Sequence, residues 1–281
     1  MMLYRPLVEG DIPAGLGLCR AAGWNQTRDD WELFLALGRR GGVVAVDEEG
    51  EVRGTAATIR YEDRFCWIGM VLVDPAHRGK GIGRKLLECS LELVADMETV
   101  KLDATPAGRN VYQKMGFVDE YGLSRMELRN VPRDRLQSSA TPMAPENMFS
   151  VTDFDLNVFG ANRSALLKAI IKRSSNYAFV FYRGDEIRAF CLGRVGHLFT
   201  HIGPVVAADL ESAREVTSAA LLNCGAMPVI IDALEHSPDW LSWLESLGFE
   251  RQRPLTRMYR GVNRWPGIPA NQFAILGPEF G

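Results

Sequence analysis

The sequence predicts an α/β protein of the α+β type, built from two mixed-sheet domains in tandem. The chain has 281 residues, which exceeds the usual size of a single domain. A stretch at 131–147 is rich in Pro and Ser, shows no helix or strand periodicity and divides the chain nearly in half. Short motifs of the first half also recur in the second half. We therefore expect domains at 1–130 and 148–281, joined by a linker at 131–147.

The internal repeat rests on three matches. Two of them share an offset of 132 residues: "MGF" and "LSRM" at 115–117 and 123–126 recur as "LGF" and "LTRM" at 247–249 and 255–258. In the third match, "WIGMVLV" corresponds to "HIGPVVA", and Gly69 corresponds to Gly203. Three matches at nearly one offset indicate a duplication, in which two copies of one unit follow each other.

The first copy shows the order of the elements. Its apolar residues alternate in strands and recur every three or four residues in helices. In chain order we expect two antiparallel strands about the turn 47–50, a strand at 66–73, a helix at 82–94, a strand at 100–104, a short helix ending at Gly116 and a strand at 123–128. Antiparallel strands followed by alternating helices and strands form a mixed sheet.

Charge and composition narrow the class of partner. The net charge is −3 and no block of Lys or Arg occurs, so we expect neither nucleic acid nor a membrane surface as a partner. No apolar stretch approaches the roughly 20 residues that span a bilayer, and the N-terminus lacks a signal-peptide core, so we expect a cytoplasmic protein. The five cysteines are scattered and never form C-x-x-C, which predicts reduced thiols and no metal site.

A glycine-rich loop, "HRGKGIG" at 77–83, lies between an expected strand and an expected helix. The first N–H groups of a helix attract phosphate when side chains leave room. Three glycines leave this room and three cations surround it: Gly79, Gly81 and Gly83, with Arg78, Lys80 and Arg84. Neither a Walker loop nor a dinucleotide fingerprint fits, because Arg84 stands where the latter needs its third glycine. A plain glycine turn into a helix is the alternative interpretation.

The stretch "VLVDPAHRGKGIGRKLL" resembles the acyl-CoA signature of the GNAT superfamily of N-acetyltransferases, R/Q-x-x-G-x-G/A after a strand that ends in V-D-P. "YQKMGF" at 112–117 resembles the second element of that superfamily, Y-x-K-x-G-F, at the expected distance. The whole chain looks like the bacterial tandem GNAT proteins, whose second domain is degenerate. This resemblance implies that acetyl-CoA is a co-substrate and that a primary amine attacks its acetyl group directly.

The resemblance also implies roles for single residues in cofactor binding. Main-chain groups of Val71, Leu72 and Val73 would hold the pantetheine arm, and Arg78 stands at the first signature position. The pyrophosphate would lie on the N–H groups of Gly79, Lys80, Gly81, Ile82, Gly83 and Arg84. The superfamily often has Asn where this chain has Thr105, so a threonine hydroxyl would have to replace that cofactor contact. It often has Ala where this chain has Gly108.

Tyr112 matches the superfamily's general acid. A phenol with a pKa of about 10 can protonate a thiolate whose acid has a pKa of about 8.5. A half-buried packing tyrosine is the alternative. The glutamate that many relatives carry on the central strand is absent from "WIGMVLV", so the general base is open between Asp103 and Asp63. Asp103 at a strand end and Asp63 in a turn also have plain structural interpretations.

Two further segments could meet the acceptor. Trp24 and Asn25 lie where the superfamily places the loop that overhangs the acceptor, although Trp24 could equally belong to the core. The tail contains "QFAIL" at 272–276, which has the apolar density of a buried strand. This strand would carry Glu279 and the terminal carboxylate toward the acceptor, unless it only edges the second domain.

The second copy differs at the positions that would bind acyl-CoA. Its loop reads "AADLESAREV", with Asp209 and Glu211 where phosphate would lie, and Leu244 replaces the tyrosine. We expect this domain to pack on the first and to shape the pocket of a small-molecule or peptide amine. The alternative function is a non-catalytic acyl-CoA sensor or regulatory protein.

Overall fold

A computed structural model of the protein describes residues 2–38 and 41–281, and within them 13 strands form one continuous sheet. The strands are β1 (Leu3–Pro6), β2 (Gly42–Val46), β3 (Val52–Tyr61), β4 (Phe65–Val73), β5 (Thr99–Ala104), β6 (Val118–Leu128), β7 (Thr141–Pro142), β8 (Phe179–Arg183), β9 (Glu186–Val195), β10 (Thr200–Ala207), β11 (Val229–Leu234), β12 (Glu250–Gly261) and β13 (Gln272–Ala274). The helices are α1 (Ile12–Ala21), α2 (Arg28–Leu37), α3 (Ile82–Leu93), α4 (Pro106–Gln113), α5 (Met148–Phe159), α6 (Ser164–Arg173), α7 (Leu210–Leu222) and α8 (Pro238–Ser246).

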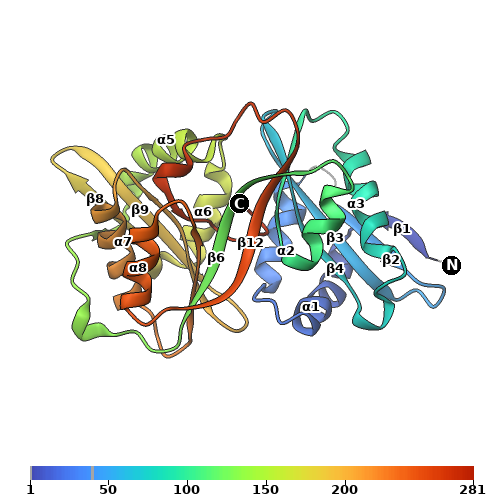
Figure 1. Ribbon diagram of the computed structural model, residues 1–281, viewed down its shortest axis with the longest axis horizontal. Helices are drawn as coiled ribbons and strands as arrows, with labels where there is room; N and C mark the ends of the chain where they lie inside the picture. Colours follow the sequence, from blue (N-terminus) through green and yellow to red (C-terminus); the bar gives the residue numbers. More distant parts are fainter. Residues whose placement is uncertain (1, 39–40) are drawn as a thin grey trace.

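Both halves follow the predicted order of elements. In the first half, β2, β3 and β4 pair antiparallel, and β4 and β5 pair parallel with α3 between them in the chain. The second half repeats this order with β8, β9, β10, α7 and β11. The α+β class with two mixed-sheet units in tandem is therefore confirmed (Figure 1).

The two halves exchange their last strands. The sheet order is β1-β2-β3-β4-β5-β12-β6-β11-β13-β10-β9-β8-β7, so β12 of the second half lies between β5 and β6 of the first. β6 in turn pairs with β11 of the second half. Figure 1 shows β6 and β12 side by side between the two halves. The expected boundaries at 130 and 148 thus divide the sequence but not the sheet.

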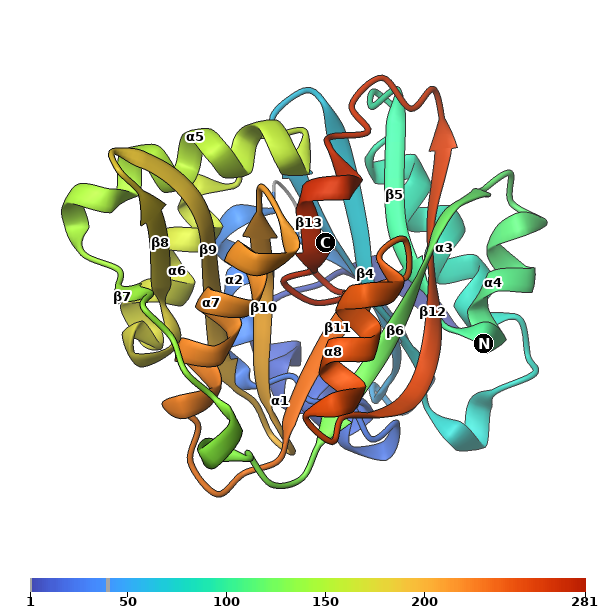
Figure 2. The ribbon, with the colours of Figure 1, turned by 60° about the vertical axis from the view of Figure 1, so that its left-hand side comes forward.

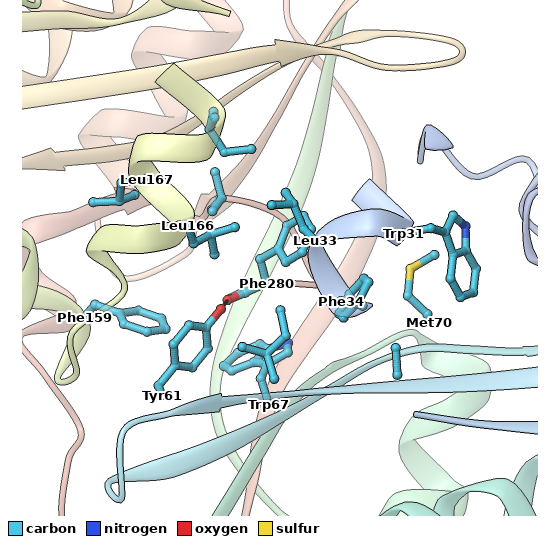
Figure 3. Packing of buried hydrophobic residues seen from close by; sticks show 14 of the residues in the cluster. Trp31, Leu33, Phe34, Tyr61, Trp67, Met70, Phe159, Leu166, Leu167 and Phe280 are labelled. Atoms are coloured by element: carbon cyan, nitrogen blue, oxygen red, sulfur yellow. Dashed lines mark hydrogen bonds between the residues drawn. The ribbon is translucent and has the colours of Figure 1, made fainter. Parts of the chain in front are cut away.

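An apolar core joins the halves. Phe280 of the tail stacks on Phe34 of α2, with ring centroids 5.0 Å apart. Phe159 of α5 meets the edge of Tyr61 of β3 at 5.0 Å (Figure 3). Trp67 of β4 belongs to the same cluster, and all five side chains are buried. Rings from both halves therefore pack in one core.

The parallel strands of each half diverge after two paired residues. In the first half, only Cys66 and Trp67 of β4 pair with β5, at Val100 and Lys101. Met70 then adopts φ +55°, and its carbonyl oxygen accepts a hydrogen bond of 2.8 Å from the Thr55 hydroxyl. This bulge turns the rest of β4 away from β5 and leaves a wedge between them.

In the second half the corresponding wedge is filled. β10 and β11 pair parallel only at Thr200–Val229 and His201–Ile230. The tail strand β13 enters beyond these pairs and hydrogen-bonds antiparallel to both β10 and β11 (Figure 2). The strand expected at 272–276 is thus present over Gln272–Ala274, inside the sheet.

Candidate functional site

A cavity at the junction of the halves collects many of the predicted site residues. Its walls come from the diverging ends of β4 and β5, from α4, from β6 and β12, and from the tail. Residues that the sequence singled out line it together: Trp24, Val71, Asp103, Thr105, Tyr112 and Glu279. The other lining residues are Gln26, Ile68, Gly69, Met70, Leu102, Arg125, Arg253, Leu255 and Pro278.

The glycine loop leaves the start of α3 uncovered. Gly79 and Gly81 have φ values of 77° and 80°, a backbone region that side chains rarely adopt, and Gly81 offers no side-chain cap to α3. Lys80 is exposed, the Arg78 Nε donates to the Val73 carbonyl at 3.2 Å, and Arg84 pairs with Glu88. The first N–H groups of α3 therefore point into space that an anion can fill.

The second half closes the same position. Asp209 caps α7, because its Oδ1 accepts a hydrogen bond from the Ser212 N–H at 2.8 Å. Its Oδ2 accepts from Arg188 Nη2 at 2.8 Å. Partial burial acts to raise the pKa of Asp209, but Arg188 and Ser212 lower it to about 2. A capped helix start with a carboxylate on it does not attract phosphate.

Tyr112 faces the cavity from α4. Its ring folds back over Gly108, where an added Cβ would lie 2.9 Å from the ring, so the glycine makes room for this orientation. Burial raises the pKa of Tyr112 to about 12, which keeps the phenol protonated at neutral pH. Thr105 also lines the cavity, although its hydroxyl caps α4 by accepting from the Gly108 N–H at 3.3 Å.

Asp103 lies on the cavity wall with both carboxylate oxygens occupied. Arg257 of β12 donates to them through Nε and Nη2 at 2.8 Å each, and its Nη1 donates to the Tyr121 hydroxyl at 2.7 Å. Burial raises the pKa of the Asp103 carboxyl, and the Arg257 guanidinium opposes that rise. A carboxylate held on both oxygens is poorly placed to accept a proton. Asp63 is exposed in the turn between β3 and β4, outside the cavity lining.

A row of charges crosses the exchanged strands. Arg253 of β12 lies opposite Arg125 of β6, which lies opposite Asp232 of β11. Arg125 donates to both oxygens of Asp232, at 2.7 and 2.8 Å. His201 of β10 adds an Nε2 that lies 3.3 Å from Asp232. Sequence reasoning missed Arg253, because nothing in "ERQRPLTRM" distinguishes it from its neighbouring arginines.

The tail passes both matched glycines. An added Cβ at Gly203 would collide with the Ile275 carbonyl oxygen, and one at Gly69 would lie 2.8 Å from the Glu279 carbonyl oxygen. Trp67 Nε1 donates to the Pro278 carbonyl at 3.0 Å. These contacts hold the tail across β10 and then across β4, which brings Glu279 into the cavity.

The Glu279 side chain meets a shared cation. Arg194 of β9 is ion-paired with the Glu279 carboxylate, and its Nε lies 3.2 Å from Oδ1 of Asp30. All three side chains are almost completely buried. One guanidinium thus serves two carboxylates.

Of the two residues expected above the acceptor, Trp24 lines the cavity and Asn25 does not. Asn25 Oδ1 accepts from the N–H groups of Leu198 and Phe199, at 2.8 and 2.9 Å, and its Nδ2 donates to the Phe199 carbonyl. Its amide therefore fixes the β9–β10 turn to the first half and is not available to an acceptor. The neighbouring Gln26 lines the cavity in its place.

The described part of the chain offers neither a membrane-spanning helix nor a metal-binding group. In residues 2–38 and 41–281, no helix is long and apolar enough to cross a membrane. Within those same residues, His, Cys, Asp and Glu side chains form no group suited to a metal ion.

Comparison with known proteins identifies the family. Models of the acetyltransferase (GNAT) domain match residues 39–119 and 151–274. A holothin acyltransferase of Pseudoalteromonas is 28% identical over 83% of this chain and 81% of its own length. The uncharacterized N-acetyltransferase YitH of Bacillus subtilis is 24% identical over 87% of this chain and 86% of its own length.

Solved structures agree with these matches. A crystal structure described as an acetyltransferase of Pyrococcus horikoshii has a TM-score of 0.82 and 25% identity, over all of this chain and 96% of the other. A tandem GNAT protein from the clavulanic acid biosynthesis pathway shares the fold, with a TM-score of 0.65 over 93% of this chain and 98% of its own. The chain therefore belongs to the GNAT acetyltransferase family, as an acyltransferase with two GNAT domains in tandem.

Proposed function

We propose that the protein transfers the acetyl group of acetyl-CoA to a primary amine bound in the cavity at the junction. One observation carries this proposal: a single cavity contains the wedge between β4 and β5 and is lined by both Tyr112 and Glu279. The uncovered start of α3 follows β4 after the short loop 74–81. A thioester lying along β4 would present its carbonyl to the same space.

The cofactor would be held by main-chain groups of the first half. Residues 71–73 lie beyond the last β4–β5 pair, so their polar groups can bind the pantetheine arm as an added strand. Gly79, Lys80, Gly81, Ile82, Gly83 and Arg84 would bind the pyrophosphate. Thr105 contacts the cofactor only if its hydroxyl donates outward while still capping α4. We place this acetyl-CoA-binding domain at 1–130, with β12 completing its sheet.

Glu279 is the proposed base and Tyr112 the proposed acid. Glu279 removes a proton from the ammonium, and the amine nitrogen attacks the thioester carbonyl carbon. The carbon–sulfur bond breaks, and Tyr112 gives its proton to the leaving sulfur. The amide nitrogen then loses its second proton, which restores the phenol. Burial raises the pKa of a thiol as it raises that of Tyr112, which makes the leaving sulfur a stronger base toward the phenol.

The second domain, placed at 148–281, has a structural part in this proposal. Its wedge is occupied by β13 and its phosphate position by Asp209. It supplies β12 and the tail to the cavity and binds no acyl-CoA of its own.

The test is thiol release from acetyl-CoA across classes of amines, with Tyr112→Phe beside wild type. We expect the variant to bind acetyl-CoA with unchanged affinity and to lose roughly a hundredfold in kcat, because general acid catalysis contributes on that scale. Tyr182→Phe on β8, which belongs to the second half and lies outside the cavity lining, is the matched control. Wild-type kcat in Tyr112→Phe at every pH would contradict the assignment of the acid.

A further inference from the structure

Two buried polar atoms in the cavity lack partners. Gln26 Oε1 and Arg253 Nε form no hydrogen bond within the described part of the chain. Gln26 is only 8% exposed. A buried polar group without a partner costs about 1–3 kcal/mol, so such groups are rare unless they serve a ligand. One of these atoms accepts hydrogen bonds and the other donates them.

Arg253 is also an unpaired cation. Its cross-strand neighbour is Arg125, and like charges directly opposite each other destabilise a sheet. Asp232 relieves this repulsion only in part, because both of its oxygens are bound by Arg125. Burial and the Arg125 charge lower the pKa of Arg253 to about 10, which still leaves it charged at neutral pH. No ion pair of Arg253 is found in residues 2–38 and 41–281.

The opposite charge is in excess nearby. Glu279 and Asp30 share the single guanidinium of Arg194, so one negative charge has no cation of its own. The Glu279 charge acts to raise the pKa of Arg253, which places the two groups near each other, although they form no salt bridge within the described residues. The cavity therefore presents an unmatched cation and an unmatched anion within one small space.

We infer that the acceptor is an amine that also bears a carboxylate, of the amino-acid type, and that Arg253 binds this carboxylate. The ammonium would then lie between Gln26 Oε1 and Glu279, which rests on the proposed function of Glu279. A guanidinium forms two parallel hydrogen bonds with a carboxylate, and such pairs discriminate strongly against ligands that lack the group. A dianionic phosphate fits poorly, since Glu279 lies close by.

The test compares protein amino acids with the amines that their decarboxylation leaves, because each pair differs only in the carboxylate. Thiol release from acetyl-CoA and melting temperature in the presence of CoA are measured for each compound. We expect wild type to prefer at least one amino acid over its matched amine by roughly tenfold or more in kcat/KM. Arg253→Gln should remove this preference by slowing the amino acid far more than its matched amine. Arg253→Lys should retain part of it.

Arg251→Gln is the matched control. Arg251 lies on the same strand, is exposed and pairs with Glu245 outside the cavity, so its loss should leave the preference unchanged. Arg253→Gln should fold at least as well as wild type, because it removes a repulsion.

The outcomes separate this inference from the function on which it rests. If amines without a carboxylate are acetylated as well as their amino acids, the inference is wrong and the acetyltransferase proposal stands. If amino acids raise the melting temperature through Arg253 but none is acetylated, the carboxylate site stands and the proposed reaction is wrong. If no amino acid is bound or acetylated, or if Arg253→Gln slows both members of a pair equally, Arg253 is not a carboxylate site.

Discussion

At the scale of single residues, two arginine–aspartate pairs join the halves. Arg257 pairs with Asp103, and Arg125 pairs with Asp232. The two arginines occupy the same position in the repeated motifs "LSRM" and "LTRM", and each one pairs with an aspartate that belongs to the other half. A one-residue slip of β6 or β12 would leave buried charges unpaired, so these pairs specify the exchanged register.

His201 makes stability depend on pH. Burial lowers the pKa of His201 below 6.5, with Asp232 opposing and the Arg194 and Arg125 charges reinforcing the shift. The His201 side chain therefore takes up a proton near pH 6.5 in the unfolded chain but stays neutral at that pH in the folded chain. The free energy of unfolding consequently falls as the pH drops below 6.5, by up to about 1.4 kcal/mol per pH unit. We expect His201→Gln to lose less stability than wild type between pH 7.5 and 5.5, measured by urea unfolding. Parallel profiles for the two proteins would exclude this role.

Gly81 tests the phosphate site. Gly81→Glu places a carboxylate at the start of α3, and we expect calorimetry to show that acetyl-CoA binding is lost while the chain stays folded. Gly184→Glu is a matched control, because Gly184 also has a positive φ, 59°, and open space around it, but lies in the β8–β9 turn. If both variants bind acetyl-CoA alike, the loop does not hold the pyrophosphate.

At the scale of elements, local pattern and long-range pairing contribute different parts of the fold. The strand expected at 66–73 and the helix expected at 82–94 agree with β4 and α3 within one residue, because hydrophobic periodicity is a local property. The position of β12 between β5 and β6 depends on segments more than 100 residues apart and leaves no local signal. The residues of the cavity differ in the same way. Tyr112 can be predicted because it belongs to a sequence motif, whereas Arg253 and Gln26 can be recognised only once the fold brings them to the cavity.

The approach of the tail to β4 depends on Gly69. A Cβ in Gly69→Ala would press on the Glu279 carbonyl oxygen at 2.8 Å and push the tail out of the cavity. We expect acetyl-CoA affinity to stay nearly unchanged and kcat/KM to fall roughly ten- to a hundredfold, since small misplacements of a reacting group cost that much. Gly225→Ala, with no atom within 4 Å of the added Cβ, is the control. Full activity in Gly69→Ala would argue against Glu279 as the base.

At the scale of the whole molecule, the sheet and the core cross the boundary between the halves. Each half contributes a strand to the sheet of the other. β12 of the second half lies between β5 and β6, and β6 of the first half lies beside β11. The core that contains Trp67 and Phe34 is closed by Phe159 and Phe280 from the second half. Burial of each large aromatic side chain contributes about 1.5–3 kcal/mol, so separation of the halves would be strongly unfavourable.

We therefore expect the intact protein to unfold in a single cooperative transition. Calorimetric and van't Hoff enthalpies should agree, although a chain of this size with two domains would ordinarily show two steps. Acetyl-CoA at about 100 times its Kd should stabilise the fold by about 2.7 kcal/mol and move the whole transition upward by roughly 5 °C. Both halves should shift together, because the second half can unfold only by removing β12 from the sheet that holds the cofactor. Two resolved transitions, with acetyl-CoA moving only one of them, would show that the exchanged strands do not couple the halves.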